Sequence, residues 1–286
     1  MSKKQKRILW PVLVMVALGL GALAFASSRN ARRAIEARPV ASQNPTAVVN
    51  ARSEEYVRAG RLWPQLRWHL KTLGDRIEKP GKERITMTGT IKRDGDPQAL
   101  PMALTLEFPD RLRLTVQEGL QQRVLTFNGH AASGVGSALT PREREFIETL
   151  VYDTAEHFFL GQTQGAVMRC LGQRFRTDDG TSPNYTGPYY DLYEVSDQIK
   201  TSVEARFQSK VFYFNSDTLL LERVRYQVSR DGAAVEVETR ISGWQQTLGQ
   251  QVPSRIVRLE NNQPVLTLTV NVASLSPKLQ DGIFGG

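Results

Sequence analysis

The sequence is poor in the side chains on which most enzymes and metalloproteins depend. Cys170 is the only cysteine among 286 residues, which excludes an intramolecular disulfide and a metal site built from cysteines. The three histidines, His69, His130 and His157, are far apart and follow no spacing typical of a metal site or a catalytic triad. The sequence also contains no phosphate-binding loop, nucleophile elbow or zinc-protease motif. It therefore predicts a protein that is not an enzyme and has no cofactor and no metal site.

An excess of positive charge is also lacking once the N-terminus is set aside. The whole chain has 37 basic and 29 acidic residues and a formal net charge of +8. Four of the basic residues, Lys3, Lys4, Lys6 and Arg7, precede an apolar run, and residues 1–26 contain no acid. The remainder has 33 basic and 29 acidic residues, a net charge of only +4. Such a weak excess argues against a protein that binds nucleic acid.

One long apolar run is present, Ile8 to Ala26, and it contains no charged residue. A basic start followed by such a run is typical of an export signal or of a membrane anchor. Ala24-Phe25-Ala26 resembles a signal cleavage site, whereas the run is about long enough to span a bilayer. Residues 1–26 therefore remain either an uncleaved anchor, which crosses the membrane through residues 8–26, or a cleaved signal. In both cases the bulk of the chain is expected beyond a membrane, in a bacterial periplasm.

The rest of the chain divides into a linker and a folded domain. Residues 27–50 are polar and predict a linker, and residues 51–286 predict one domain. Two segments have helical spacing of apolar residues. The first is expected to start near Ser53 and to reach Ile77; the second begins at Thr140 with a capping box around Pro141 and reaches Phe158.

Most of the domain alternates between apolar and polar residues, which is typical of strands with one wet face. In the stretch LEFPDRLRLTV, for example, Leu112, Leu114 and Val116 alternate with Arg111 and Arg113 after a Pro-Asp turn. About ten or eleven such strands follow one another with turn signals between them. The pattern predicts a mainly β (α+β) protein. Two packed sheets would satisfy it, but a single sheet this long tends to curl, and the helices would then cover its concave face.

Several motifs resemble one protein family. They are FPDRLR at 108–113, LTFNG at 125–129, FYFNSDTLL at 212–220, GQQVPSRI at 249–256 and DGIF at 281–284. Their order is similar to that in the outer-membrane lipoprotein-sorting superfamily of LolA/LolB-like half-barrels, which includes the lipid-binding relative RseB. The resemblance covers roughly residues 52–286. It implies a curved antiparallel sheet of about eleven strands forming an open half-barrel, with helices over an apolar concavity that holds acyl chains.

The sequence and the resemblance together predict a non-enzymatic protein that binds a lipid or a lipoprotein acyl chain in the cell envelope. An envelope sensor or interaction protein of the same fold, whose cavity is not used for lipid transport, is the alternative. The chain has no lipoprotein cysteine after its apolar run, and a tethered protein cannot shuttle across a periplasm. An envelope protein partner is compatible with either function. The residues expected to line the cavity are Leu104, Leu106, Leu112, Leu114, Val116, Val224 and Tyr226 on strands, with Phe146 and Leu150 on the covering helix.

Overall fold

The computed structural model describes most of the predicted domain. All described residues belong to one compact unit, Val49–Gly286. The predicted anchor or signal and the predicted linker lie outside them. In the described part of the chain, no helix is long and apolar enough to span a bilayer. The described residues are 55–57, 69, 72, 83–136, 138–163, 166–177, 184–200, 205–230, 232–247, 250–277 and 282–284.

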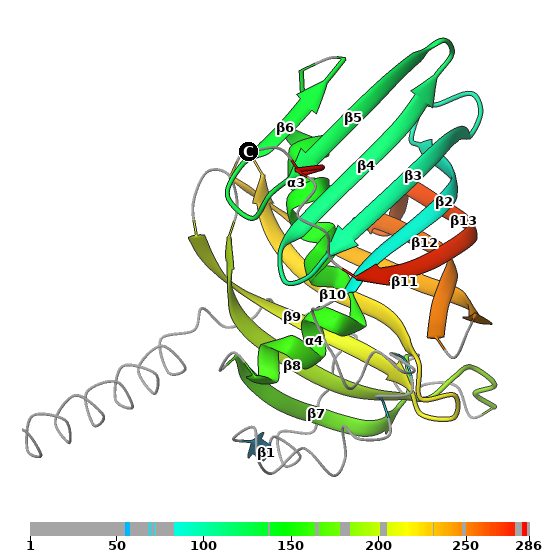
Figure 1. Ribbon diagram of the computed structural model, residues 1–286. Coiled ribbons are helices and arrows are strands. Elements are labelled where there is room, and N and C mark those ends of the chain that lie inside the picture. The colour runs from blue at the N-terminus through cyan, green and yellow to red at the C-terminus, as the bar shows by residue number, and fades with distance from the viewer. Residues whose placement is uncertain are drawn as a thin grey trace, which may run out of the picture. The chain divides into compact units, whose positions relative to one another are not determined.

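A single antiparallel sheet forms the body of the protein (Figure 1). Its described strands follow the order β1-β7-β8-β9-β10-β11-β12-β13-β2-β3-β4-β5-β6, so the sheet has two edges, β1 and β6, and does not close. The predicted open half-barrel is confirmed, with two more strands than the eleven expected. The strands are β1 (Glu55–Val57), β2 (Glu83–Arg93), β3 (Leu100–Glu107), β4 (Arg111–Glu118), β5 (Gln121–Phe127), β6 (Ala132–Val135), β7 (Val167–Phe175), β8 (Tyr190–Lys200), β9 (Ala205–Asn215), β10 (Leu221–Arg230), β11 (Ala233–Thr247), β12 (Gln250–Glu260) and β13 (Gln263–Pro277).

The predicted hairpin around Pro109 is β3–β4. Leu104 pairs with Leu114 and Leu106 with Leu112. All four side chains are buried, whereas the alternate residues of β4 are partly or fully exposed. Strict alternation therefore placed the apolar row of this hairpin on the inner face of the sheet, as the sequence predicted.

The second predicted helical segment is present but broken. It forms α3 (Pro141–Thr149), the 3-10 turn η3 (Leu150–Asp153) and α4 (Ala155–Thr163). The predicted capping box is confirmed: Thr140 Oγ1 accepts a hydrogen bond from Glu143 N at 3.2 Å, and Thr140 N donates to Glu143 Oε2 at 3.0 Å. The break is at Thr154, whose backbone is extended. Its hydroxyl accepts from His157 N and so caps α4. Both helices run along the concave side of the sheet (Figure 1).

The first predicted helix is wrong at its start, whereas His69 and Thr72, farther along it, are in 3-10 helical conformation. Glu55–Val57 forms strand β1, which pairs with β7 through Glu55–Cys170 and Val57–Met168. The backbone hydrogen bonds that an extended segment gains at a strand edge outweigh the weak helical propensity of a short segment. The remainder of that helix lies outside the described residues, apart from His69 and Thr72.

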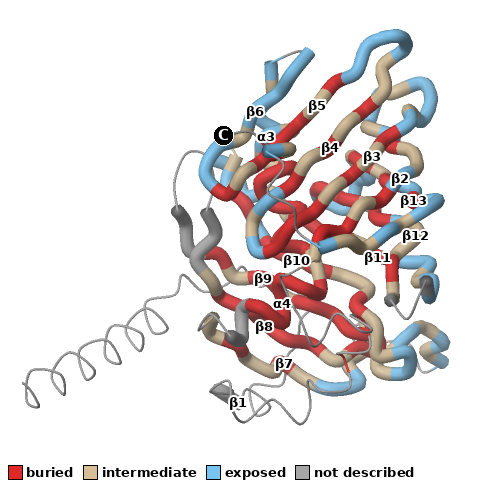
Figure 2. Tube along the Cα trace, in the orientation of Figure 1, coloured by how far each residue is buried: buried red, intermediate tan, exposed pale blue. Residues whose placement is uncertain are grey.

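Two large clusters make up most of the core, and the helix break lies between them. The buried residues lie along the strands and on the helices that cover them (Figure 2). The first cluster joins β2–β5, β12 and β13 to α3 and η3 through residues such as Phe146, Leu150 and Val151. The second joins β7–β11 to α4 through residues such as Ala155 and Phe158. Because one straight helix cannot follow a strongly curved sheet, the break lets each half pack on its own part of the concave face.

The outer face of the sheet is not uniformly polar. On β10 and β11, arginines and glutamates pair across the strands, including Arg225 with Glu236 and Arg223 with Glu238. On β7–β9, however, a third apolar cluster occupies the outer side. Tyr190 and Tyr213 meet there edge to face at 5.8 Å, and the guanidinium of Arg223 lies over the Tyr190 ring. The expectation of one wet face throughout is therefore wrong for these strands, because their outward positions are aromatic and aliphatic.

The sheet splits between β12 and β13. Starting from their hairpin turn, the two strands are paired from Glu260–Gln263 as far as Arg255–Thr269. Beyond that point each strand follows its other neighbour. β12 stays paired with β11 to Gln250, and β13 stays paired with β2 to Pro277. A bulge between Val270 and Val272 accompanies the separation, since bulges bend and twist a strand.

Gly89 holds β2 close to β13 beside this split. A Cβ at Gly89 would lie 1.9 Å from the carbonyl oxygen of Thr269, which is backbone and cannot move aside. We expect Gly89→Ala to lower the free energy of unfolding by about 2–3 kcal/mol. Gly172→Ala is the matched control, since a Cβ there meets nothing within 4 Å, and it should change stability by less than about 0.5 kcal/mol. Urea titration measures both; equal stability of the two variants would contradict the close approach.

Candidate functional site

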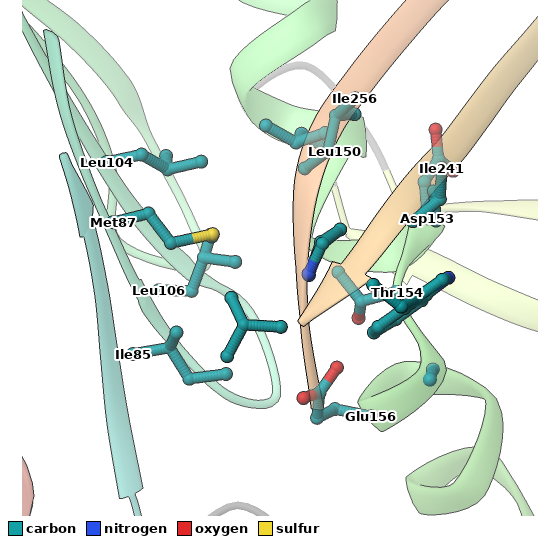
Figure 3. Close-up of a pocket in the computed structure, with 14 residues that line it drawn as sticks. Ile85, Met87, Leu104, Leu106, Leu150, Asp153, Thr154, Glu156, Ile241 and Ile256 are labelled. Carbon is teal, nitrogen blue, oxygen red and sulfur yellow. The ribbon is translucent and has the colours of Figure 1, made fainter. Parts of the chain in front are cut away.

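A pocket opens at the seam between the two large core clusters (Figure 3). It has about 520 Å³ of space between its walls, part of it open to solvent, but only about 40 Å³ is wide enough for the centre of a water molecule. It is therefore a narrow apolar cleft rather than an open cup. Its lining residues are Ile85, Met87, Leu104, Leu106, Leu150, Asp153, Thr154, Ala155, Glu156, Ile241, Trp244, Val252, Pro253 and Ile256.

The pocket has two walls and a roof. Ile85 and Met87 on β2 form one wall together with the apolar row of β3, and Ile241 and Ile256 lie opposite, on β11 and β12 (Figure 3). The roof is the chain between Leu150 and Glu156, where the helix is broken. The pocket exists because the split sheet and the broken helix leave a seam that neither core cluster fills.

The structure brings together only some of the residues predicted to line the cavity. Leu104, Leu106 and Leu150 line this pocket. The others are buried elsewhere, so their contact with a ligand stays a prediction. Leu112, Leu114, Val116 and Phe146 lie in the first cluster, and Val224 and Tyr226 lie in the second. Phe146 also lines a separate, charged pocket at the start of α3.

The side chains missed by the sequence prediction on the far wall are Ile241 and Ile256. Each alternates with polar neighbours in the same manner as the predicted residues. Outside β7–β9, alternation identifies the inner face of a strand. It cannot tell which inner residues border a seam, because this depends on strand order and on where the sheet splits.

A buried ion pair fixes the helix break to the sheet. Asp153, at the end of η3, accepts hydrogen bonds from Lys210 Nζ at 2.5 Å, from Thr239 Oγ1 at 2.7 Å and from Tyr226 OH at 3.1 Å. The side chains of Asp153 and Lys210 are 0% and 3% exposed. Charges so deeply buried are tolerated only when they are paired and hydrogen-bonded. Asp153 therefore connects η3 to β9, β10 and β11.

A second buried cation continues this network. Arg258 on β12 donates to Glu145 Oε1 at 2.6 Å, and to Thr149 Oγ1 and Tyr226 OH at 3.1 Å each. Burial acts to lower the pKa of Arg258, but its neighbours, first Tyr226 and then Asp153 and Glu145, together hold it above its ordinary value. Burial raises the pKa of Tyr226. The hydroxyl of Tyr226 thus belongs to the polar network.

The sequence contains a signal for these inward charges. Lys210 is in phase with Phe212 and Phe214, which are buried in the second cluster, and Arg258 is in phase with Ile256. A cation at an inner position of an apolar row requires a buried partner. The partner itself could not be identified, because Asp153 is 57 residues from Lys210 in the chain.

His157 on α4 is buried next to the ion pair. Its ring meets Tyr152 edge to face at 5.0 Å. Burial, together with the nearby charge of Lys210, lowers the pKa of His157 to about 3. The imidazole is thus neutral in the folded protein across the ordinary pH range.

The three histidines occupy different surroundings. His69 is buried, with Nε2 3.3 Å from both Asp191 Oδ2 and Tyr193 OH, and Nδ1 3.3 Å from the carbonyl oxygen of Leu219. His157 lies beside Tyr152, and His130 is exposed in a turn. None of the partners of His69 lines the pocket. This cluster joins distant segments of the chain by hydrogen bonds.

The chemistry of the pocket is that of an apolar cleft. Asp153, one of its two carboxylates, accepts three hydrogen bonds from neighbouring strands. Among the described residues, no group of three or more histidines, cysteines or carboxylates could hold a metal ion. The site can bury an apolar chain.

Because the ion pair is buried, we expect removal of one partner to reduce the stability of the protein strongly. Lys210→Met leaves the Asp153 charge buried without its cation, so we expect a loss of about 3–5 kcal/mol in the free energy of unfolding. Adding Asp153→Asn removes that charge and should restore more than half of the loss, in a double-mutant cycle measured by urea titration. Asp217→Asn is the control: it removes a carboxylate from an exposed pair with Arg174 and should cost under about 0.5 kcal/mol. Additive effects of Lys210→Met and Asp153→Asn would contradict the pairing.

The lowered pKa of His157 predicts that the free energy of unfolding depends on pH. Its pKa is lower in the folded protein than the ordinary 6.5, so the unfolded chain binds the proton first. The contribution of His157 to the free energy of unfolding is therefore fully present above about pH 6.5. It decreases as the pH falls towards 3, by at most about 1.4 kcal/mol per pH unit. His157→Gln should flatten this slope between pH 6.5 and 5, while His130→Gln, at an exposed position, should keep it. Urea titrations across that range measure the slope; an unchanged slope in His157→Gln would refute the assignment.

Comparisons with known proteins give similar structures but no sequence relative. No family model and no curated protein matches the chain. A LolA superfamily protein, NE2245 from Nitrosomonas europaea, is 14% identical over 80% of this chain and 98% of that one, with a TM-score of 0.47. A domain assigned as an outer membrane lipoprotein-sorting protein, from Vibrio parahaemolyticus, is 10% identical over 79% and 97%, with a TM-score of 0.46. A DUF1329 family protein from Desulfovibrio piger is 13% identical over 78% and 96%, with a TM-score of 0.44.

These likenesses concern the fold alone. Two of the three proteins carry names of the superfamily that the sequence motifs resemble. Identities below 15% and TM-scores below 0.5 transfer no residue's role and no ligand to this chain. The open antiparallel half-barrel is seen directly in the sheet of this chain, while the resemblance to the lipoprotein-sorting superfamily stays a prediction from the sequence motifs.

Proposed function

We propose that this chain is a non-enzymatic binding protein that holds the acyl chain of a lipid or of a lipid-modified protein. The observation that carries the proposal is the composition of the pocket: eleven of its fourteen lining residues are apolar. These side chains come from both halves of the sheet and from the helix break. A flexible, unbranched chain is the ligand that best suits a long, narrow cleft of this kind.

The energetics fit such a ligand. Each buried methylene contributes about 0.8 kcal/mol, so about eight of them provide about 6 kcal/mol, which corresponds to binding in the range of tens of micromolar. The ligand must part the walls, because only about 40 Å³ is wide enough for a water molecule. Separation of α4 from η3 at Thr154 would widen the roof, at the cost of the contact that Leu160 of α4 makes with the first cluster.

The location follows from the N-terminal run. We propose that residues 8–26 hold the protein at a membrane or direct its export, so that the domain lies in the bacterial envelope. Lipids and acylated proteins are abundant there, and an envelope protein partner would deliver or receive the ligand. An N-terminal sequence and an intact mass of the mature protein distinguish a retained anchor from a cleaved signal.

The binding proposal is tested with the purified protein. We expect native mass spectrometry, after a mild preparation that preserves lipids, to show a bound acyl lipid. A neutral acyl probe bearing bromine should quench the fluorescence of Trp244, which lines the pocket, and this quenching should disappear in Trp244→Phe. Ala155→Phe places a ring in the pocket and should weaken binding at least about tenfold, since the space that it fills is the binding space.

Ala138→Phe is the matched control, because Ala138 is exposed and lines no part of the pocket. It should bind the probe as the unchanged protein does. Thermal melts of both variants show whether they fold. Absence of lipid together with absence of probe binding in the folded protein would refute the proposal and favour an interaction protein whose cleft stays closed.

A further inference from the structure

The split between β12 and β13 has a pocket of its own. About 200 Å³ of it is wide enough for the centre of a water molecule, compared with about 40 Å³ in the apolar pocket, although the total space between the walls is similar in the two. We call it the β12–β13 gap. It is lined by Gln245, Val252, Pro253, Val270, Asn271, Val272 and Ala273.

The gap adjoins the apolar pocket. Val252 and Pro253 line both spaces, so these two residues of β12 form the boundary between them. Pro253 pairs with Trp244 of β11, and Trp244 also lines the apolar pocket. A ligand with its chain in the apolar pocket therefore has its other end within reach of the gap.

The gap has the chemistry of a peptide-binding edge. Within the described residues, β12 before Arg255 and β13 beyond Thr269 each have a strand partner on one side only. Strand edges pair with amides, because their backbone N–H and C=O groups alternate at the spacing of a peptide; Pro253 contributes only its carbonyl. Gln245 and Asn271 add neutral side-chain amides, and no charged residue lines the gap.

The charges around the two spaces also indicate which polar end groups of a bound lipid the gap would not accommodate. The apolar pocket has two carboxylates in its lining, Asp153 and Glu156, and neither space is lined by a lysine or an arginine. A free carboxylate or a phosphate would thus be desolvated without a cation to pair with it. A neutral head with amide donors and acceptors satisfies the strand edges without that cost.

Building on the proposed acyl-binding function, we propose that the β12–β13 gap is the head-group subsite of the protein. It takes a neutral, amide-bearing head, attached to an acyl chain that occupies the apolar pocket. The backbone edges of β12 and β13 bind the amide groups, and the side chain of Gln245 contributes to this recognition. The ligand class is thus an acyl chain in amide linkage rather than a free fatty acid.

Three probes with one dodecanoyl chain test the proposal: N-dodecanoyl-glycinamide, methyl dodecanoate and dodecanoate. We expect the amide probe to bind about fivefold to tenfold more tightly than the ester, through one or two additional hydrogen bonds, and dodecanoate to bind most weakly. Gln245→Leu should reduce the advantage of the amide over the ester to about threefold or less. Gln246→Leu, which removes an exposed amide next along β11 that does not line the gap, should leave the advantage unchanged.

A second measurement does not depend on any variant. The amide probe carries a photoreactive diazirine either on its head or at the end of its chain, and labelled peptides are mapped by mass spectrometry. The head label should attach to residues 270–273 or to Gln245, and the chain label to the β2 and β3 wall of the apolar pocket.

The outcomes separate the two proposals. If the ester and the amide bind equally, or if the head label attaches away from the gap while the chain label stays in the apolar pocket, the head-group subsite is refuted and acyl binding stands. If no probe binds the folded protein, acyl binding itself is refuted, and the subsite with it.

Discussion

A very long antiparallel sheet has turned most of its apolar residues to one side, and the described residues provide little helix to cover them. In the described part of the chain the cover is the segment 141–163. A straight helix would touch a curved sheet over only part of its length. The break at Thr154 lets α3 pack on the strands around β4 and α4 on the strands around β9. The division of the core follows from this break.

Buried charge stabilises the break. Ending a helix inside the protein leaves polar backbone and side-chain groups that need partners. Asp153 supplies a carboxylate at that point, and Lys210, Tyr226 and Thr239 come to it from three neighbouring strands. Such a network is directional, unlike apolar packing, so it sets which part of the sheet the break faces. Arg258 and Glu145 extend the same arrangement to α3.

The apolar pocket and the β12–β13 gap have a common origin. The sheet is continuous near the hairpin turn of β12 and β13 and divided beyond Arg255. On the concave side the division leaves a seam lined by apolar residues, and within the sheet it leaves two strand edges. An amphipathic ligand matches both features together, since its chain and its head require different chemistry.

The mainly β class, the inner face of hairpins such as β3–β4 and the capped start of the helix at Thr140 could be predicted from the sequence. These are local properties, set by alternation and by turn and capping residues. Strand pairing overrode helical propensity at Glu55–Val57, and aromatic residues buried the outer face of β7–β9. The fold was needed to show that Leu104, Leu106 and Leu150 border a cleft while Leu112 and Val224 are core, and that Lys210 meets Asp153. The reason is physical: a cleft and a buried ion pair are formed by residues far apart in the chain, so they depend on strand order and on where the sheet divides, which no local pattern contains.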